Sequence, residues 1–217
     1  MDYSIDALRT QLYSAVVADA LDRLGFRHQS PRVRLQLCTL TAATVIGRCK
    51  TTLWADMADA DPRPYELELK AVDECQPDDV LIAAAGGSMR SGIWGELLTA
   101  AALNTGCVGV IVDGAIRDVS KIAALRFPVF ARGSCVYDSL HRQRVIDIDV
   151  RVEIDGVCFA PGDLVIADQD GIVVIPQSVE AETLRLALNK VEGENTVRDA
   201  IRQGMKSTAA FQKYGIL

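Results

Sequence analysis

The sequence predicts an α/β fold in which a mixed sheet contains a central parallel βαβ unit and a long helix lies near the C-terminal end. Two short apolar runs, residues 80–85 and 108–112, flank an alanine-rich segment whose apolar residues recur at helical spacing. A strand–helix–strand unit of this length is nearly always a right-handed parallel crossover. Later in the chain several strand-like segments follow one another without helices, and residues 178–204 then show the spacing of a long helix.

Capping residues, turn residues and apolar spacing predict the elements before this unit. The expected elements are helices over residues 4–12 and 14–24, a strand or a bent pair of strands over residues 40–54, and a helix over residues 64–73. Gly25 is expected to end the second helix. In the helix over residues 64–73, Leu67, Leu69 and Val72 are expected to point partly inward.

A polar turn over residues 113–118 is expected directly after the second strand of the unit. Asp118 could cap the short helix that follows it. The remaining expected elements are short strands over residues 127–130 and 134–137, hairpins over 145–159 and 164–175, and helices over 178–204 and 207–214.

The length and composition favour one globular domain over residues 1–217. The chain has 217 residues, of which 49% are hydrophobic and 24% charged, so it can bury a substantial core. No apolar run approaches the roughly 18 to 20 residues that would span a bilayer. The first six residues are partly acidic and contain no apolar segment, so we expect no signal peptide and a cytoplasmic location.

The charge and the cysteines exclude two classes of site. A formal net charge of −6 argues against nucleic-acid binding through phosphate contacts, because these require a basic face. The six cysteines lie far apart in the sequence, mostly in apolar contexts, so we expect reduced thiols in the core. A zinc site would need ligand pairs two to four residues apart, and the cysteines form none.

The candidate site lies at the carboxyl ends of the two strands of the βαβ unit. A glycine-rich loop over residues 86–96 follows the first strand, and Arg117 and Asp118 follow the second. Because both loops leave the same edge of a parallel sheet, we expect Glu96, Arg117 and Asp118 to be neighbours. Ligands commonly bind at this edge, where helix N-termini offer free N–H groups.

The glycine pattern around these residues resembles the RraA-like family. This family includes the class II 4-hydroxy-4-methyl-2-oxoglutarate/4-carboxy-4-hydroxy-2-oxoadipate aldolases and the regulator of ribonuclease E activity. Its aldolases carry an acidic residue, then twenty residues, then Arg-Asp, and here twenty residues separate Glu96 from Arg117. This chain has Glu at the position where the characterised aldolases have Asp. The segments that carry the resemblance are Gly95-Glu96, Gly106, residues 109–118, residues 127–130, Asp19-Ala20-Leu21, Pro161-Gly162-Asp163, residues 168–171, Glu194 and Arg198.

The resemblance implies a β/β/α swivelling-domain-like sandwich and a divalent-metal-dependent aldolase. The reaction would cleave a 4-hydroxy-2-oxo acid to pyruvate and a second carbonyl product, and the same enolate would allow decarboxylation of oxaloacetate. Asp118 would hold Mg²⁺ or Mn²⁺, and Arg117 would donate to the oxygen on which negative charge develops. The backbone N–H groups of Ile93, Trp94, Gly95 and Glu96 would bind the substrate carboxylate.

The base that accepts the hydroxyl proton has more than one candidate. Glu96 could act through a metal-bound water, and by resemblance Glu194 of a neighbouring subunit could help orient that water. Family members resemble trimers, so a homotrimer or a dimer of trimers with sites between subunits is expected. Arg90 could bind a distal carboxylate, although a solvated loop arginine is the simpler interpretation.

Several other assignments are weaker. The aspartates at positions 56, 59 and 61 could bind a metal, but spaced aspartates before a proline are common in turns. His28 and His141 have no motif around them. The loop contains no lysine, which argues against a Schiff-base aldolase.

Two function classes remain open beside each other. The first is the metal-dependent aldolase with a small 2-oxo acid as substrate, and the second is a non-enzymatic regulator that binds ribonuclease E. The joint presence of Glu96, Arg117 and Asp118 favours the enzyme. Methyl transfer has little support, because no acidic ribose-binding pattern follows Gly86-Gly87.

Overall fold

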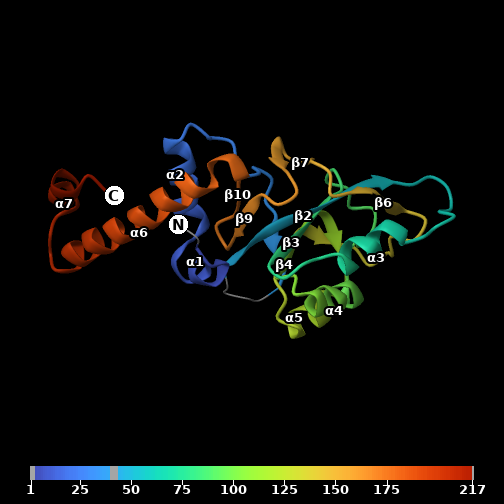
Figure 1. Cartoon of the computed structure of the whole chain (residues 1–217). Helices are drawn as coiled ribbons and strands as arrows, with labels where there is room; N and C mark the ends of the chain where they lie inside the picture. Colours follow the sequence, from blue (N-terminus) through green and yellow to red (C-terminus); the bar gives the residue numbers. More distant parts are fainter. Residues whose placement is uncertain (1–2, 40–43, 217) are drawn as a thin grey trace.

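The computed structural model describes residues 3–39 and 44–216, and its centre is a mixed sheet (Figure 1). The strands are β1 (Gln36–Leu37), β2 (Val45–Asp56), β3 (Asp79–Ala84), β4 (Gly109–Ile116), β5 (Val129–Ser134), β6 (Gln143–Ile148), β7 (Val152–Ile154), β8 (Val157–Phe159), β9 (Leu164–Ala167) and β10 (Ile172–Ile175). The helices are α1 (Ile5–Gln11), α2 (Ser14–Arg23), α3 (Glu66–Asp73), α4 (Glu96–Thr105), α5 (Val119–Ala124), the 3₁₀ turn η1 (Gln177–Val179), α6 (Glu180–Arg202) and α7 (Ser207–Tyr214).

The strands of the main sheet lie in the order β1-β5-β4-β3-β2-β9-β10, and β6 pairs with the second half of β2. Strands β2 to β5 are parallel, with Thr51 opposite Ile82 and Ile82 opposite Ile111. Strands β1, β6, β9 and β10 join antiparallel to their neighbours. The predicted mixed sheet with a parallel β3–α4–β4 unit is therefore confirmed.

Successive side chains of the central strands point to opposite faces of the sheet, so part of the core lies on each face. Leu81, Val110 and Val112 face α3, α4 and α5, and they pack with buried helix residues such as Ala102 and Ile122. The neighbouring residues of the same strands face the β7–β8 hairpin on the other side. A third cluster packs α1, α2 and α6 on β9 and β10. This is the layered β/β/α arrangement that was expected.

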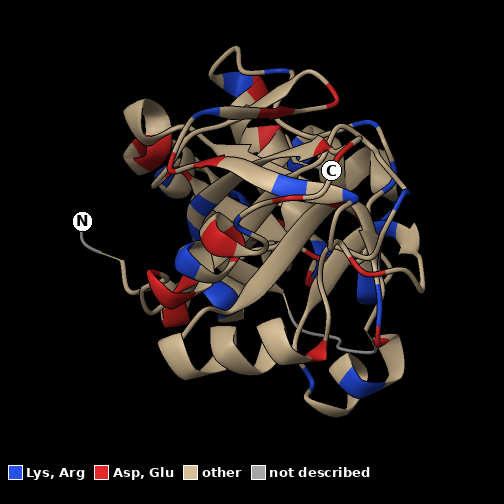
Figure 2. Cartoon of the chain, turned by 90° about the vertical axis from the view of Figure 1, so that its right-hand side faces the viewer, with Lys and Arg blue, Asp and Glu red and all other residues tan. Residues whose placement is uncertain are grey.

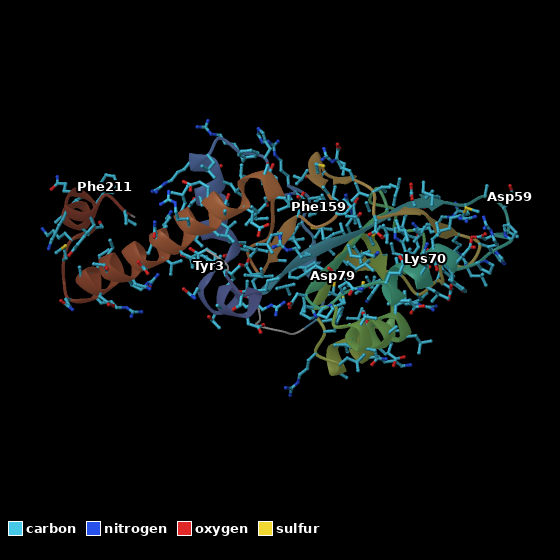
Figure 3. All side chains as sticks on the ribbon, in the orientation of Figure 1. Tyr3, Asp59, Lys70, Asp79, Phe159 and Phe211 are labelled. Atoms are coloured by element: carbon cyan, nitrogen blue, oxygen red, sulfur yellow. The ribbon has the colours of Figure 1, made fainter. Side chains whose placement is uncertain are left out.

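The molecule is elongated because α6 extends beyond the sheet. The first part of α6 packs against α2, whereas its last turns contact α7 and lie away from the sheet (Figure 1). Phe211 on α7 and Asp59 after β2 mark opposite ends of the molecule (Figure 3). The long C-terminal helix predicted over residues 178–204 is confirmed with slightly narrower bounds.

Two predictions around the βαβ unit were wrong. The polar turn expected from residue 113 is still strand, because β4 continues to Ile116 and Asp113 is buried within it. Arg132 on the adjacent strand β5 makes this possible, since its Nε lies 2.6 Å from Asp113 Oδ1 and pairs with the buried charge. The strand expected over residues 134–137 does not form, since β5 ends at Ser134.

The helix predicted over residues 64–73 begins later and turns a different face inward. Helix α3 starts at Glu66, after Tyr65 in the left-handed region with φ 63°. Its buried residues are Glu68, Ala71 and Val72, whereas Leu69 is 50% exposed. The predicted inward position of Leu69 was therefore wrong, and the acidic residue Glu68 is buried instead.

Two further predictions concern the strand before α3 and the cysteines. The strand expected over residues 40–54 is present from Val45, and residues 40–43 lie outside the described residues. All six cysteines are free thiols, as expected. Three of them are buried in the core, but Cys158 is exposed.

Candidate active site

The loop before α4 and the segment after β4 are joined by backbone hydrogen bonds. Ile93 N–H donates to the carbonyl of Ala115 at 2.9 Å, and Arg117 N–H donates to the carbonyl of Trp94 at 2.8 Å. These bonds fix the start of α4 beside the turn that carries Arg117. The convergence of the two loops, predicted from the parallel crossover, is therefore confirmed.

Two glycines allow this close approach. A Cβ on Gly92 would lie 2.6 Å from the carbonyl oxygen of Cys135 and 2.9 Å from Arg117 Cβ. A Cβ on Gly95 would lie 2.9 Å from Asp118 Oδ2. The glycine pattern in the sequence thus reflects how tightly the backbone of one loop packs against the side chains of the other.

A pocket of about 370 Å³ opens at this edge, between α3, the N-terminus of α4 and the turn after β4. Its lining includes the predicted residues Ile93, Gly95, Glu96, Arg117 and Asp118. Residues that the sequence analysis did not select complete it: Tyr65, Glu68, Leu69, Gly92, Leu97, Leu98, Asp138 and Ser139.

Arg117 is held by Asp138, which lies beyond β5. Arg117 Nη2 lies 2.7 Å from Asp138 Oδ2. The other carboxylate oxygen, Oδ1, accepts hydrogen bonds from the Tyr65 hydroxyl at 2.7 Å and from Leu140 N–H at 2.8 Å. Burial alone raises the pKa of Asp138, but the bonds from Leu140 and Tyr65 and the charge of Arg117 outweigh it, so this pKa lies below its ordinary value. Asp138 is therefore an ionised anchor for the guanidinium.

The same contacts shift the titration of Tyr65. Burial, the hydrogen bond to Asp138 and the charge of that carboxylate raise the pKa of Tyr65 to about 12. The phenol is therefore neutral at physiological pH, and its hydroxyl donates to Asp138.

Asp118 precedes α5 in the left-handed conformation, with φ 55° and ψ 30°. Its side chain makes no capping bond to α5, so the predicted capping role was wrong. Asp118 Oδ2 instead accepts a hydrogen bond from Glu96 N–H at 3.3 Å and lies 3.9 Å from Arg117 Nε. The carboxylate is thus turned back toward the pocket and the start of α4.

The side chains of the pocket can be compared with the ligands that Zn²⁺ and Mg²⁺ require. No group of three or more His, Cys, Asp or Glu residues with the geometry of a metal site occurs within residues 3–39 and 44–216. This does not fit a zinc site built from protein ligands. A hard cation such as Mg²⁺ is commonly bound through one or two carboxylates and keeps several waters. Asp118, with a single long hydrogen bond, is a carboxylate available for that role.

Glu68 is a buried acid in the pocket wall. It is 8% exposed, and Ser139 Oγ donates to its Oε2 at 3.5 Å. Burial and, less strongly, the charge of Asp138 raise the pKa of Glu68 to about 8. Glu68 is therefore mostly protonated at neutral pH. The sequence signal for its inward position was its helical spacing to Ala71 and Val72 on the same face of α3.

The backbone donors predicted for substrate binding differ in availability. Ile93 N–H is bonded to Ala115, so this predicted donor is not available, although the residue lines the pocket. Trp94 is buried outside the pocket lining, with its indole Nε1 donating to Thr99 Oγ1 at 2.8 Å. Within the described residues, the N–H groups of Gly95, Leu97 and Leu98 have no acceptor.

Helix α4 presents its N-terminus to the pocket and carries a single charged side chain. Glu96, in the first turn, is its one charged residue, and the helix is almost entirely uncharged along its length in Figure 2. Its first turn offers the unpaired N–H groups of Leu97 and Leu98. The helix start therefore favours an anionic group in the pocket.

Glu194 lies outside this pocket in the single chain. It is on α6, where its carboxylate accepts a hydrogen bond from the Tyr13 hydroxyl and lies 3.6 Å from Lys190 Nζ. Burial and this hydrogen bond raise the pKa of Tyr13 to about 12. The role of Glu194 in a neighbouring subunit's site stays a prediction.

The other residues considered in the sequence lie outside the pocket lining. Arg90 is exposed in the glycine loop. Asp61 is buried and pairs with Arg144 at 3.0 Å, and its N–H donates to His141 Nδ1 at 3.0 Å. Asp61 therefore serves the local structure.

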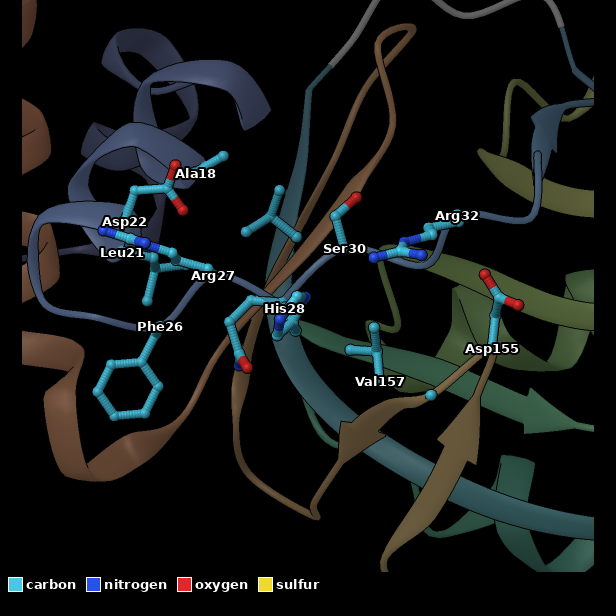
Figure 4. Close-up of a pocket in the computed structure, with 13 residues that line it drawn as sticks. Ala18, Leu21, Asp22, Phe26, Arg27, His28, Ser30, Arg32, Asp155 and Val157 are labelled. Carbon is cyan, nitrogen blue, oxygen red and sulfur yellow. The ribbon is translucent and has the colours of Figure 1, made fainter.

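A second pocket of about 440 Å³ lies between α2 and the β7–β8 turn. Figure 4 shows Asp22 and Arg27 on one side of it and Arg32 and Asp155 on the other, with His28 between them. Asp155 is already engaged, since it accepts a hydrogen bond from Val33 N–H at 2.7 Å. This pocket is exposed and contains none of the residues predicted to act in catalysis.

In the part of the chain that the structure describes, none of the helices is both long enough and apolar enough to cross a bilayer.

Two known proteins illustrate the similarity of the chain to other sequences. A protein of Halalkalibacterium halodurans named "Putative 4-hydroxy-4-methyl-2-oxoglutarate aldolase" is 35% identical over 143 residues, which cover 66% of this chain and 68% of that protein. Protein DlpA of Legionella pneumophila is 31% identical over 147 residues, but these cover only 23% of its length.

Two solved structures share the fold over most of the chain. The crystal structure of Streptomyces coelicolor RraAS2, described as an unusual member of the RNase ES inhibitor RraA protein family, has a TM-score of 0.77 and 30% identity and covers 91% of this chain and 98% of its own. An uncharacterized protein from Pseudomonas syringae has a TM-score of 0.84 and 25% identity, covering 99% of this chain and 98% of its own. The family model described as RraA-like, Aldolase/RraA, matches residues 14–174, and the chain belongs to this RraA-like family.

Proposed function

We propose that this protein is a divalent-metal-dependent aldolase that cleaves a 4-hydroxy-2-oxo acid to pyruvate and a second carbonyl compound. The observation that carries the proposal is the lining of one pocket by Glu96, Arg117 and Asp118 beside the N-terminus of α4. The relatives named as aldolases support the same reaction class.

The reaction places one requirement on the site. A base takes the proton of the C4 hydroxyl, the C3–C4 bond breaks, and its electron pair forms the enolate of pyruvate while the C4 fragment leaves as a carbonyl compound. Protonation at C3 then gives pyruvate. The site must therefore stabilise negative charge on the C2 oxygen as it develops.

Arg117 is the residue best suited to this stabilisation. A guanidinium has five N–H donors, and the bond to Asp138 uses Nη2. The remaining donors can bind the C2 oxygen in a position that Asp138 fixes before the substrate arrives. The free N–H groups of Gly95, Leu97 and Leu98 can bind the C1 carboxylate.

Asp118 would hold the divalent cation, Mg²⁺ or Mn²⁺. A bound cation would supply Lewis-acid stabilisation of the enolate oxygen. Glycine at position 95 leaves room for the Asp118 carboxylate, because a Cβ there would lie 2.9 Å from Oδ2. The chain's own contribution is thus to aim this carboxylate at the pocket.

Glu96 is the candidate base, acting through a water molecule at the start of α4. Glu194 would orient that water from a neighbouring subunit of a homotrimer or a dimer of trimers. The protrusion of α6 beyond the sheet is consistent with an intersubunit role (Figure 1).

Two measurements test the proposal. Deuterium exchange at the methyl group of pyruvate in D₂O, followed by ¹H NMR, reports enolate formation without any distal part of a substrate. Pyruvate release from 4-hydroxy-2-oxo acids reports the complete reaction. Both should require Mg²⁺ or Mn²⁺ and stop with a chelator. Exchange and release that continue unchanged in the chelator would contradict the metal-dependent mechanism.

A second candidate function is a regulator that binds ribonuclease E. It is favoured by the likeness to RraAS2, which has 30% identity over 91% of this chain. A pull-down with purified ribonuclease E would retain this protein if the second function applies. Retention of the ribonuclease by a protein that fails to exchange pyruvate would favour the regulator over the enzyme.

A further inference from the structure

The charges that line the pocket are strongly unbalanced. Arg117 is the one cationic side chain among the described lining residues. Four acidic residues line the same pocket: Glu96, Asp118 and Asp138, and also Glu68, which is mostly protonated and adds little charge. Arg117 is already paired with Asp138 at 2.7 Å, and its Nε lies 3.9 Å from Asp118. A substrate with two carboxylates would therefore find Arg117 and the cation proposed at Asp118 at its reacting end, and no further cationic side chain of this chain for its distal carboxylate.

Arginines near the pocket are engaged elsewhere. Arg132 pairs with buried Asp113, and Arg144 pairs with Asp61. Arg142 donates to the backbone carbonyl of Asp138 at 3.1 Å, and its guanidinium lies over the ring of Tyr137. Each of these side chains would have to give up an existing contact to neutralise a distal carboxylate.

The wall contributed by α3 offers neutral hydrogen-bonding groups. The Tyr65 hydroxyl donates to Asp138, which leaves its oxygen able to accept. Glu68 is mostly protonated at neutral pH, because its pKa is raised to about 8, and a protonated carboxyl both donates and accepts. The Ser139 hydroxyl adjoins Glu68. These groups match the hydrogen-bonding pattern of alcohols.

Resting on the proposed aldolase function, we propose that this pocket selects 4-hydroxy-2-oxo acids whose distal end is neutral and hydroxylated over those that end in a second carboxylate. The reacting end lies against Arg117, Asp118 and the start of α4. The distal hydroxyls face Tyr65, Glu68 and Ser139. A distal carboxylate placed there would face Asp138 with no cationic side chain of this chain beside it, and like charges brought together in this way weaken binding.

The volume is compatible with such a substrate. A pocket of about 370 Å³ is at the small end of the range for ligand sites, roughly 300 to 1,000 Å³. Leu97 is 78% exposed and Leu69 is 50% exposed. These leucines form the outer part of the lining, where they add apolar surface and no charge.

A matched pair of five-carbon substrates tests the inference. 4,5-Dihydroxy-2-oxopentanoate and 4-hydroxy-2-oxoglutarate differ only in a hydroxymethyl or a carboxylate at C5. With the whole protein and Mg²⁺ at neutral pH, we expect kcat/KM for the dihydroxy acid to be at least about tenfold higher, which is about 1.4 kcal/mol. An equal or higher kcat/KM for the dicarboxylate overturns the inference.

Pyruvate exchange separates failure of this inference from failure of the proposed function. Protein that exchanges the pyruvate methyl protons but does not cleave the dihydroxy acid overturns the substrate preference and leaves enolate chemistry standing. Protein that neither exchanges pyruvate nor cleaves either acid contradicts the aldolase itself, and the inference falls with it.

A charge-adding variant gives a second test. Leu97→Lys places a cation in the pocket lining at a solvent-exposed position of α4, so the fold should tolerate it. We expect the preference for the dihydroxy acid to fall by about tenfold. Leu103→Lys is the matched control, because Leu103 is 43% exposed on the same helix and outside the lining. An unchanged preference in Leu97→Lys, or an equal change in Leu103→Lys, overturns the inference.

Discussion

Arg117 Nη2 lies 2.7 Å from Asp138 Oδ2, so the guanidinium after β4 is anchored by a carboxylate that follows β5. The anchor is itself fixed, because Asp138 Oδ1 accepts bonds from Tyr65 and Leu140. Arg117 is thus presented to the pocket in one orientation. A preorganised donor of this kind stabilises developing charge without reorganising during the reaction.

Asp138→Asn should lower kcat/KM by about 10- to 100-fold, the range found when a group that orients another is removed. The amide keeps an oxygen for both Tyr65 and Leu140 but loses the charge that holds Arg117. We expect kcat to fall more than KM rises, since the orientation matters most in the transition state. Steady-state kinetics measure this split, and a variant with wild-type kcat would show that Arg117 needs no anchor.

Asp118→Asn should reduce pyruvate exchange by at least about 100-fold while the protein stays folded. Asn tolerates the left-handed conformation at this position, and the side chain makes only one long hydrogen bond. Circular dichroism and the Tm monitor folding. Asp170→Asn is the control, because it removes an exposed carboxylate in the β9–β10 turn. Full activity in Asp118→Asn would remove Asp118 from the mechanism.

Gly95→Ala should reduce activity by about tenfold or more with little change in stability. The backbone φ of −147° is open to alanine, so the helix start is not strained. The new Cβ would lie 2.9 Å from Asp118 Oδ2, and this flexible carboxylate would have to move. The affinity for Mn²⁺, measured by titration, should fall together with activity. Unchanged affinity and activity would mean that Asp118 is not positioned by this contact.

Glu68→Gln should make the protein less sensitive to pH between about 4.5 and about 8. The pKa of Glu68 is raised from 4.5 to about 8 in the folded protein, so the folded state binds more protons than the unfolded state in this window. Wild-type stability therefore falls as the pH rises through the window. Burial and Asp138 raise this pKa, while Ser139 and Arg117 lower it.

The expected size of this effect is a few kcal/mol, because each unit of pKa shift corresponds to about 1.4 kcal/mol. Urea unfolding at several pH values measures it. The stability of Glu68→Gln relative to wild type should increase with pH and level off above about pH 8. A difference that stays constant with pH would show that Glu68 has an ordinary pKa.

The sequence predicted the part of the site that is formed by elements consecutive in the chain. Glu96, Arg117 and Asp118 follow adjacent parallel strands, and the rule that such strands end at one edge was enough to bring them together. The glycine pattern that carried the family resemblance includes Gly95, and the structure gives its physical reason, since a Cβ at position 92 or 95 would meet the other loop. The mixed sheet and the long C-terminal helix also followed from periodicity and turn residues.

The rest of the pocket depends on pairings between distant segments. Asp138 reaches Arg117 only because β5 lies beside β4, and Tyr65 and Glu68 come from a helix that precedes the βαβ unit. Asp113 resembled a turn residue in the sequence, but Arg132 from the next strand allows it to be buried. The sequence predicted that Ile93 N–H would bind the substrate carboxylate, but in the structure this N–H donates to the carbonyl of Ala115. No local pattern encodes these partners.

Exchange of the pyruvate methyl protons in D₂O tests the central claim most directly, because it requires only the enolate that Arg117 and Asp118 are proposed to stabilise. With Mg²⁺ or Mn²⁺, the wild-type protein should exchange these protons, and Arg117→Gln should slow the exchange by about 100-fold or more. Wild-type protein that leaves the methyl signal intact, or Arg117→Gln that exchanges at the wild-type rate, would contradict the account.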